Sequence, residues 1–329
     1  MATLLASSLP LSPSETRKPT KQLNNGNFAH DDYTISKVAV KMPNKNVMLK
    51  NKWHVRGITR LVAVIMVHCL AMLAPFTFNW GAFWVAFLLH LITGFGITLS
   101  FHRNLTHKSF TLVKWVEYLF AYFGSLAFQG DPIGWVRTHR HHHKFTDSKR
   151  DPHSPLEGFW HSHIYWIFDP TTLAQKRDVT SIVKDLETQQ FYMFMKRTYI
   201  LHQFALALLL YALGGFPYVV WGMGVRIIYV YHTTFSVNSV CHVWGTQVWN
   251  TGDLSKNNWW VSIVTWGEGW HNNHHAFEYS ARHGLEWWQI DLTWYVIKLL
   301  ETLGLAKDVK LPTQAHLQRM AFKIKATQD

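Results

Sequence analysis

Cysteine is nearly absent from this 329-residue sequence, which contains only Cys69 and Cys241. Two cysteines cannot build a disulfide framework or a cysteine zinc site, so any metal bound here needs other ligands. Acidic residues are also few, with 20 Asp and Glu against 32 Lys and Arg. The resulting net charge of +12 comes with no basic helix, RNA-binding motif or internal repeat, so the composition does not indicate a nucleic-acid-binding protein.

Charge is also missing from long parts of the chain, which form four apolar runs. The first two runs are close to the roughly 20 residues that a helix needs to cross a bilayer. Short uncharged connections join the first run to the second and the third to the fourth. We therefore predict an all-α membrane protein with four transmembrane helices in two hairpins, over residues 58–78, 81–101, 199–213 and 217–240.

The regions outside these runs are polar. Two hairpins place the N-terminal leader, residues 102–197 and the region after the fourth run on one side of the membrane, where we predict a polar helical cap. The stretch 113–128 contains Lys114 and Glu117 and is expected at the membrane interface. Arg226 lies inside the fourth run, where an arginine is costly without a partner, and the sequence identifies none.

We predict that residues 1–52 form a leader and that residues 53–329 form one domain. The first 14 residues are rich in Ser, Leu and Ala and contain no acid, and Arg17, Lys18 and Lys21 follow them. This pattern is typical of an organellar transit peptide. A disordered cytosolic tail is the alternative, so the leader favours a plastid membrane and leaves the endoplasmic reticulum open.

Histidine is abundant, with 21 copies, and part of it is grouped. The spacing i, i+3, i+4 in the second and third groups puts three imidazoles on one face of a helical turn. The two histidines of the first group are five apart and do not share a helix face. They can reach a metal together only where the helix end unwinds or where two ions are bridged. The groups are His102 and His107; His139, His142 and His143; and His271, His274 and His275.

Neutral imidazole is a good ligand for iron, and imidazoles from several segments can enclose a pair of metal ions. A single histidine-rich patch is more often a solvated surface or an adventitious zinc site. Three groups on the same side of the membrane instead indicate a metal centre. His141 points away from the face of its neighbours, and His68 and His90 are expected to pack within the spans. Six further ungrouped histidines also lack cluster spacing, namely His153, His161, His163, His202, His232 and His283.

The pattern HxxxxH, HxxHH, HxxHH resembles the membrane fatty acyl desaturases of the Δ9-type branch. The first group lacks the Cys-Gly of the Δ12/Δ15 branch, and the third begins with His271 where front-end desaturases carry Gln. The resemblance covers residues 53–322. The stretches GDPIGWVRTHRHHHKFTDSKRDPHSP, NTGDLSKNNWW and GEGWHNNHHAFEYSARHGLEWWQ are similar to plant acyl-lipid desaturases, particularly those of plastids that act on palmitate of monogalactosyldiacylglycerol. His141 stands where the plant proteins usually carry Tyr, and the leader is shorter than that of the plastid enzyme.

The resemblance implies a centre of two Fe ions. Asn238 and His242 match the family's NxxxH segment, so His242 is implied as a ninth histidine ligand and Asn238 as a ligand through water. The implied sets are His102, His107, His139, His143 and His274 for one iron, and His142, His242, His271 and His275 for the other. Carboxylates near the groups are candidates to hold the imidazoles by their free N–H groups; these are Asp131, Asp147, Asp151 and Glu268.

The expected reaction is oxygen-dependent insertion of a cis double bond, of Δ9 or Δ7 type, into a saturated acyl chain on a glycerolipid or acyl-CoA. We expect an apolar tunnel lined by Trp and Phe, and an electron donor that is ferredoxin in a plastid or cytochrome b5 at the endoplasmic reticulum. Arg137, Lys144 and Arg150 are candidate contacts for a head group or the donor, with solvated surface charges as the alternative. Glu268 and His271 form an ExxH unit, but its second copy is missing, which excludes a soluble carboxylate di-iron bundle. A membrane hydroxylase and a histidine-lined metal transporter are the alternative functions.

Overall fold

Helices make up almost all regular structure in the computed structural model, which describes residues 55–169 and 182–322. These residues belong to one unit that spans residues 40–329. The predicted leader lies outside the described residues. The only sheet in the described part pairs two short antiparallel strands, β1 (Thr111–Leu112) and β2 (Ala306–Lys307). The fold is therefore mainly helical, as the sequence predicts.

The first two apolar runs form helices as expected. Helix α2 (Val55–Met72) continues into the turn η1 (Ala74–Phe76). Helix α3 (Trp80–Phe95) begins where the Asn79 side chain accepts the Ala82 backbone N–H at 2.8 Å, a standard N-cap. It continues without interruption as a π-helix, η2 (Gly96–Thr106). The second apolar segment thus extends five residues beyond the predicted end at 101.

The last two apolar runs lie in one 54-residue helical segment, Gln190–Val243. This segment comprises α9 (Gln190–Val219), the π-helix η5 (Val220–Val225) and α10 (Arg226–Val243). The described residues therefore contain three helices that are long and apolar enough to cross a membrane, where the sequence predicts four. The helical geometry is interrupted inside α9, at Gly214 and at Gly215, whose φ of 68° favours glycine.

Both arms of this segment contact the same end of helix α4 (Lys114–Ser125). The Gln203 amide donates to the Ser125 carbonyl at 2.8 Å, and the Arg226 guanidinium donates to the Leu126 carbonyl at 2.9 Å. A straight α-helix would separate residues 23 positions apart by about 35 Å. The chain therefore bends back between Gln203 and Arg226, and the Gly214–Gly215 break lies within this stretch.

Arg226 is fully buried, and its partners are backbone carbonyls. Its Nε donates to the Gly222 carbonyl at 2.6 Å and its Nη1 to that of Leu126. Nη1 also lies 3.4 Å from the Thr93 hydroxyl. These contacts supply the partners that could not be identified from the sequence, because two of them come from helices more than 90 residues away.

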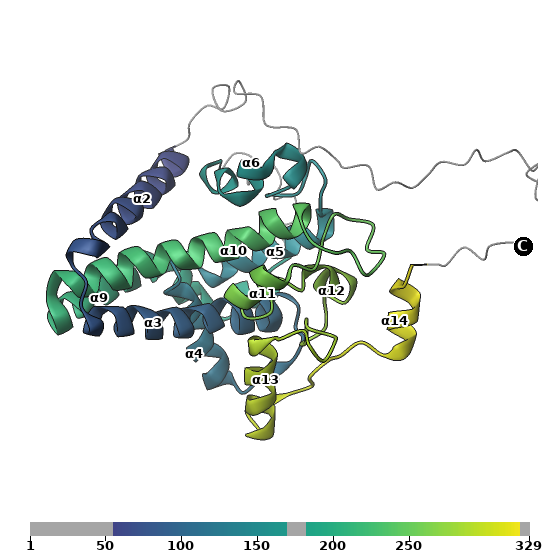
Figure 1. Cartoon of the computed structure of the whole chain (residues 1–329). Helices are drawn as coiled ribbons and strands as arrows, with labels where there is room; N and C mark the ends of the chain where they lie inside the picture. Colours follow the sequence, from purple (N-terminus) through teal and green to yellow (C-terminus); the bar gives the residue numbers. More distant parts are fainter. Residues whose placement is uncertain (1–54, 170–181, 323–329) are drawn as a thin grey trace, which may run out of the picture. The chain divides into compact units, whose positions relative to one another are not determined.

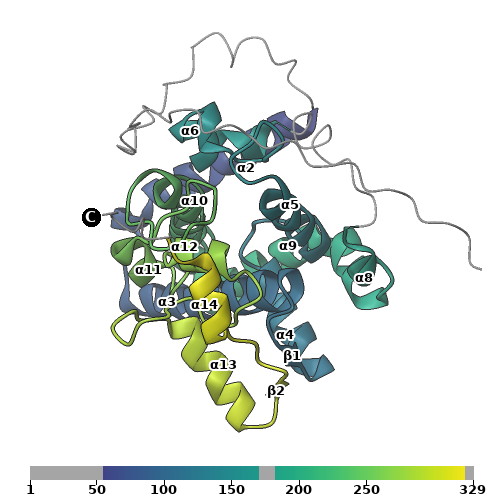
Figure 2. The ribbon, with the colours of Figure 1, turned by 90° about the vertical axis from the view of Figure 1, so that its right-hand side faces the viewer.

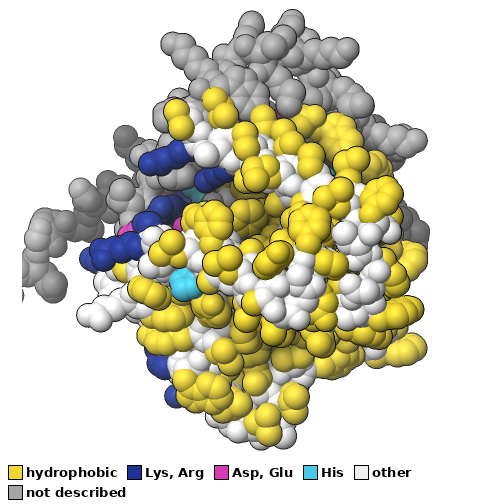
Figure 3. Space-filling model, turned by 90° about the vertical axis from the view of Figure 1, so that its left-hand side faces the viewer, with side chains coloured by type: hydrophobic (Ala, Val, Ile, Leu, Met, Phe, Trp, Pro, Cys, Tyr) yellow, Lys and Arg dark blue, Asp and Glu magenta, His cyan; other side chains and the backbone are white. Residues whose placement is uncertain are grey.

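The outer surface of the apolar helices is hydrophobic. Figure 3 shows the face at the left of Figure 1, where side chains of hydrophobic type cover most of the surface and Lys and Arg gather along one edge. Contiguous apolar surface of this extent is typical of a protein that lies in a membrane. The described apolar helices and this surface together identify a membrane protein.

The remaining helices form the polar part of the chain. The Asp131 carboxylate accepts the Gly134 N–H at 3.0 Å and caps helix α5 (Pro132–Phe145), so it serves the helix start and not an imidazole as predicted. Phe101 of η2, Ile133 of α5 and Tyr192 of α9 share one buried apolar cluster, which fixes these elements against each other. The other elements are η3 (Pro155–Glu157), α6 (Phe159–His163), η4 (Tyr165–Phe168), α8 (Lys184–Glu187), α11 (Trp259–Val264), α12 (His271–Ala276), α13 (Leu292–Thr302) and α14 (Gln314–Met320).

Candidate metal centre

The structure brings nine histidines together in two groups. In both views of the ribbon α12 lies beside α10, and Figure 2 shows α5 facing them (Figures 1 and 2). The His142 ring on α5 lies 5.6 Å from that of His242 on α10 and 5.3 Å from that of His275 on α12. Within each group, one ring nitrogen of every member lies within 4.8 Å of those of the other members. The first group is His102, His107, His139, His143 and His274, and the second is His142, His242, His271 and His275.

The π-helix η2 explains the five-residue spacing of the first histidine pair. In a π-helix each N–H bonds to the carbonyl five residues earlier, so residues five apart lie close together. The His107 N–H accordingly donates to the His102 carbonyl at 3.2 Å, and the two ring centroids are 5.0 Å apart. The expectation that these histidines do not share a helix face holds for an α-helix but is wrong for this segment.

Helices α5 and α12 each contribute to both groups. On α5, His139 and His143 belong to the first group, and His142 belongs to the second. On α12, His274 belongs to the first group, and His271 and His275 belong to the second. The rings of His143 and His275 are only 4.7 Å apart, so the two groups adjoin. This arrangement suits two metal ions held close together.

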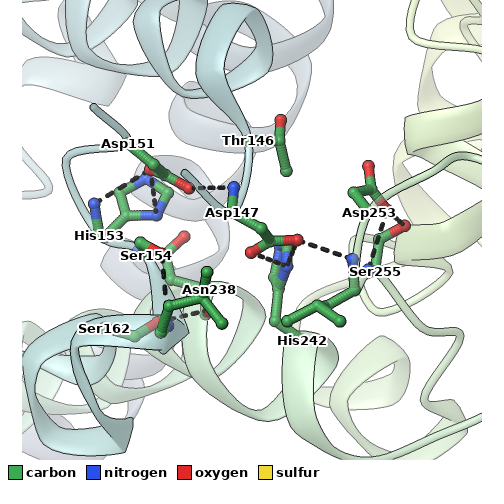
Figure 4. Close-up of polar contacts among 12 residues, drawn as sticks. Thr146, Asp147, Asp151, His153, Ser154, Ser162, Asn238, His242, Asp253 and Ser255 are labelled. Carbon is green, nitrogen blue, oxygen red and sulfur yellow. Dashed lines mark hydrogen bonds and ion pairs between the residues drawn. The ribbon is translucent and has the colours of Figure 1, made fainter. Parts of the chain in front are cut away.

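A carboxylate holds the Nδ1 atom of five of these imidazoles. Because Nδ1–H donates to the carboxylate, Nε2 keeps its lone pair for a metal. Figure 4 shows Asp147 directed at His242 in this way. The pairs are His102–Glu268 at 2.5 Å, His142–Asp151 at 3.0 Å, His242–Asp147 at 3.1 Å, His275–Asp253 at 2.8 Å and His143–Glu278 at 3.3 Å.

Three of these carboxylates, Asp147, Asp151 and Glu268, are among the residues predicted for this purpose. The predictions missed Asp253 and Glu278. Glu278 lies three residues after His275, but its partner His143 is on another helix. Asp253 lies 22 residues from its partner His275, in a loop without a recognisable metal-site spacing. No local sequence signal identifies either pair.

The positions of the imidazole nitrogens fit a metal cation. His274 Nε2 lies 3.1 Å from His102 Nε2 and 2.9 Å from His143 Nε2. Imidazole binds a transition metal such as zinc at about 2.0–2.1 Å, which separates two ligands at right angles by about 2.9 Å. Nε2 atoms of His107, His142 and His275 are buried and have no hydrogen-bond partner in the described part of the chain. A bound cation would satisfy these lone pairs, which would otherwise be costly to bury.

Burial favours the neutral, metal-binding form of several of these imidazoles. Burial and the neighbouring histidines lower the pKa of His271 and His274 well below the usual value of 6.5. Asp147 acts in the opposite direction on His242, whose pKa is raised despite burial. Burial alone raises the pKa of Asp151, but His142 and His153 outweigh it and the net shift is downward. His271 and His274 are therefore neutral, and Asp151 is ionised, at neutral pH.

A buried network of charged residues holds one histidine of the first group, His102, in place. Arg103 is completely buried and binds Glu268 through Nε and Nη2 and Asp291 through Nη1 and Nη2, with distances of 2.8–3.1 Å. Glu268 in turn holds His102. Arg103 thus fixes the carboxylate that orients a histidine, a role that was not predicted from the sequence.

Other histidines lie near the site or away from it. His283 and His153, which lack cluster spacing, are buried beside it, where their ring centroids lie 4.5 Å from His274 and 4.3 Å from His142, respectively. His141 instead contacts the Arg150 carbonyl with Nε2 at 2.9 Å, away from both groups. The structure thus separates His141 from its neighbours, as its position on α5 predicts.

The three cations predicted to contact a head group or donor have different surroundings. The Arg137 guanidinium donates to Glu187 at 2.6 Å. Arg150 is exposed and stacks on the Phe145 ring, 3.8 Å from the centroid. Lys144 is exposed and lies 5.5 Å from the same centroid. Of the three, Lys144 and Arg150 are open to solvent.

A cavity leads from the histidines into the apolar helices. It encloses about 630 Å³ of empty space, including its open mouth. His102, His139 and His271 line one part of it together with Asn238. The lining also includes His90, Gly94, Ile97, Thr98, Trp135, Val230, Thr233, Thr234, Val237, Val264, Thr265, Trp266 and Glu268. Threonine and valine thus supply much of a lining that was predicted to consist of Trp and Phe.

Apolar helices, two adjoining histidine groups and an apolar cavity are the features of a membrane enzyme with a candidate metal centre. Residues 78–302 match the model of the fatty acid desaturase family, and the chain belongs to this family. It is 62% identical over 289 residues to palmitoyl-monogalactosyldiacylglycerol delta-7 desaturase, chloroplastic, of Arabidopsis thaliana, covering 88% of this chain and 78% of the relative. It is 54% identical over 294 residues to acyl-CoA C20 Delta5-desaturase of Anemone leveillei, covering 89% and 94%. With delta-9 acyl-lipid desaturase 1 of Arabidopsis thaliana it shares 50% over 302 residues, covering 92% and 97%.

The chain is therefore a fatty acyl desaturase, an oxidoreductase of lipid metabolism, with histidine clusters that could bind metal. Its relatives bear the names of acyl-lipid and acyl-CoA desaturases. Neither a hydroxylase nor a metal transporter is favoured.

Proposed function

We propose that the two histidine groups hold two Fe ions and that this centre desaturates a saturated acyl chain bound in the adjoining cavity. The observation that carries the proposal is the convergence of nine imidazole nitrogens in two adjoining groups, several of them buried without partners. The first group binds one ion and the second group binds the other, with Asn238 reaching its ion through a water molecule. With O2 and two external electrons, a bound iron pair supplies the oxidising power that removes hydrogen from an unactivated chain.

The residues of this chain orient the ligands and the substrate. Glu268, Asp151, Asp147 and Asp253 keep Nδ1 protonated on their histidines, so that each Nε2 faces the metal. The cavity excludes water and holds one segment of a flexible chain beside His102, His139 and His271. Positioning is the main contribution of the protein, because no side chain has a pKa suited to removing a proton from a methylene group.

The membrane layout is part of the proposal. We infer that the break at Gly214–Gly215 divides the third segment into two spans, giving four spans in two hairpins. Support comes from Gln203 and Arg226, on either side of the break, which bond to adjacent carbonyls. This layout puts the histidine groups on one side of the membrane, in a polar helical cap.

The substrate and the compartment follow from the relatives. The relative at 62% identity is named for palmitate of a galactolipid and is chloroplastic, whereas others are named for acyl-CoA. We propose a glycerolipid acyl chain, Δ7 or Δ9 regiochemistry and a plastid membrane with ferredoxin as donor. The alternative is an acyl-CoA substrate at the endoplasmic reticulum with cytochrome b5.

The test is expression in yeast, with fatty acids profiled by lipid class and double bonds located by mass spectrometry. A new cis monounsaturated acid that appears with the wild type and is absent with His271→Ala supports the proposal. An oxygenated acid as sole product would contradict it. Iron analysis of the purified protein should give about two ions per chain in the wild type, the number set by the two histidine groups. Imaging a fusion that carries residues 1–52 tests the compartment separately.

A further inference from the structure

A second hollow adjoins the cavity that leads from the histidines. It is an open groove with about 860 Å³ of empty space, including its open side. Thr233 of α10 and Val264 of α11 line both the cavity and the groove, so these two side chains form a common wall. The groove is also lined by Ala71, Ile228, Tyr229, His232, Ser236 and Trp260.

Most of the groove is formed by the apolar helices. Ala71 lies in the first candidate span, and Ile228 and Ser236 lie in the third. Ile228 and Ser236 are eight residues apart on α10, a distance of about 12 Å along the helix axis. An occupant of the groove would thus lie along α10, in the direction that acyl chains take beside a helix that crosses a membrane. This position indicates lipid chains as the surroundings of the groove.

Three polar side chains that line the groove already have partners within the protein. The Thr233 hydroxyl donates to the Tyr229 carbonyl at 2.8 Å, and the Ser236 hydroxyl donates to the His232 carbonyl at 2.7 Å. Both ring nitrogens of His232 contact nitrogens of neighbouring histidines, at 3.3 and 3.0 Å. Because these groups need neither water nor a polar ligand, covering them with an apolar occupant costs little. The groove therefore suits a hydrocarbon chain.

We propose that the groove holds the second acyl chain of a diacyl glycerolipid whose first chain lies in the cavity beside the histidine groups. The proposal rests on the proposed function and deepens it, because it commits the substrate to a lipid with two chains. The chains of such a lipid are esterified to neighbouring glycerol carbons, so when one chain enters the cavity the other must lie close by. The common wall of Thr233 and Val264 places the groove where this second chain is needed. An acyl-CoA has a single chain and would leave the groove to other membrane lipids.

Photo-crosslinking on the full chain in nanodiscs of dioleoylphosphatidylcholine tests the groove directly. The probe is a galactolipid with one palmitoyl chain and one chain that carries a diazirine near its middle, and labelled residues are mapped by mass spectrometry. We expect labels on Ile228, Tyr229 and Trp260. Val237→Trp fills the cavity but not the groove, and it should reduce this labelling about tenfold because the same lipid occupies both. Equal labelling in Val237→Trp and the wild type would show that an independent membrane lipid fills the groove, which would overturn the proposal.

Steady-state kinetics supply a second test. Ile228→Trp narrows the groove and should raise the KM for the two-chain galactolipid about tenfold relative to the KM for its single-chain lyso form, the effect of displacing about two methylene groups. Ile65→Trp is the matched control, because it makes the same change on α2 at a residue that is 51% exposed and does not line the groove. An unchanged KM ratio in Ile228→Trp, or an equal change in Ile65→Trp, would contradict a seat for the second chain. A wild type that desaturates neither lipid would refute the proposed function instead, and the groove is then judged from the crosslinks.

Discussion

Replacing Asp253 by asparagine should impair the metal centre by changing the tautomer of one histidine. Asp253 Oδ2 accepts the Nδ1–H of His275 at 2.8 Å. Its Oδ1 accepts the Thr251 hydroxyl and both the N–H and the hydroxyl of Ser255. In Asp253→Asn, these three donors hold the amide oxygen in the Oδ1 position, so the amide NH2 faces His275. An amide donor at Nδ1 places the imidazole proton on Nε2, where it blocks metal binding.

The size of the effect follows from the loss of one ligand and its carboxylate. Changes in residues that hold metal ligands typically reduce metal affinity by about 10–100-fold, or about 1.4–2.8 kcal/mol. Asp253→Asn should fall at the upper end, because it turns the ligand nitrogen into a donor. Asp147→Asn should cost less, because no set of donors fixes one oxygen of Asp147: its Oδ2 accepts the Leu254 N–H, and both oxygens lie near His242.

The assay is iron per chain after dialysis against graded chelator, combined with fatty acid profiles in yeast. The control is Asp308→Asn, which removes the same charge from an exposed loop residue with φ of 54°, a conformation that asparagine tolerates. Iron retention by Asp253→Asn equal to that of the wild type would refute the tautomer argument. Equal losses in Asp253→Asn and Asp147→Asn would show that the fixed orientation of the amide does not matter.

The remaining predictions concern ligands, stability and the cavity. Alanine at any of the nine grouped histidines should abolish product formation in yeast, whereas His141→Ala should largely preserve it; equal loss at His141 would show that the ligand register is wrong. Arg103→Met leaves the buried Glu268 and Asp291 without their arginine partner and should lower the free energy of unfolding by about 3–5 kcal/mol. The melting temperature in detergent should fall, whereas a conservative change on the lipid-facing surface should leave it unchanged. Burial and His232 lower the pKa of His163 to about 4, so below its unfolded pKa of 6.5 the unfolded chain binds a proton that the folded chain does not. Stability should fall by about 2 kcal/mol from pH 7.5 to pH 5, and His163→Phe should remove this part of the slope. In Gly94→Ala the new Cβ would lie 2.2 Å from the Trp266 ring, which must shift into the cavity, so longer acyl chains should be desaturated less than shorter ones.

The histidine groups could be predicted because their chemistry is local. The spacing on α5 and α12 places His139 and His143, or His271 and His275, one helical turn apart, and the structure keeps that geometry. The helical, membrane-bound character follows equally from apolar length. The iron ligation itself stays a prediction until metal is measured.

The partners of these histidines could not be predicted, because they depend on contacts across the fold. Asp253, Glu278 and Arg103 are ordinary charged residues until folding brings them to His275 of α12, His143 of α5 and Glu268, respectively. The partners of Arg226 are likewise carbonyls of another helix and of its own preceding turn. Asp131 was a candidate to hold an imidazole, but its carboxylate instead accepts the Gly134 N–H at the start of α5. This contact is local in the sequence.

The π-helix η2 makes the length of this membrane segment as important as its composition. Most spans accept the exchange of one apolar residue for another, and a hydrophobic run has no preferred residue count within a few positions. Loss of one residue between His102 and His107 would instead turn everything beyond it by close to a quarter turn around the helix axis. The carbonyls of Leu105 and Thr106, which hold Arg140 of α5, would turn with it. Relatives that keep this centre should therefore accept other apolar residues at positions such as Ile97 and Leu99 but no insertion or deletion within Gly96–Thr106. A histidine pair five apart at the end of an apolar run becomes a sign of a widened helix in other sequences.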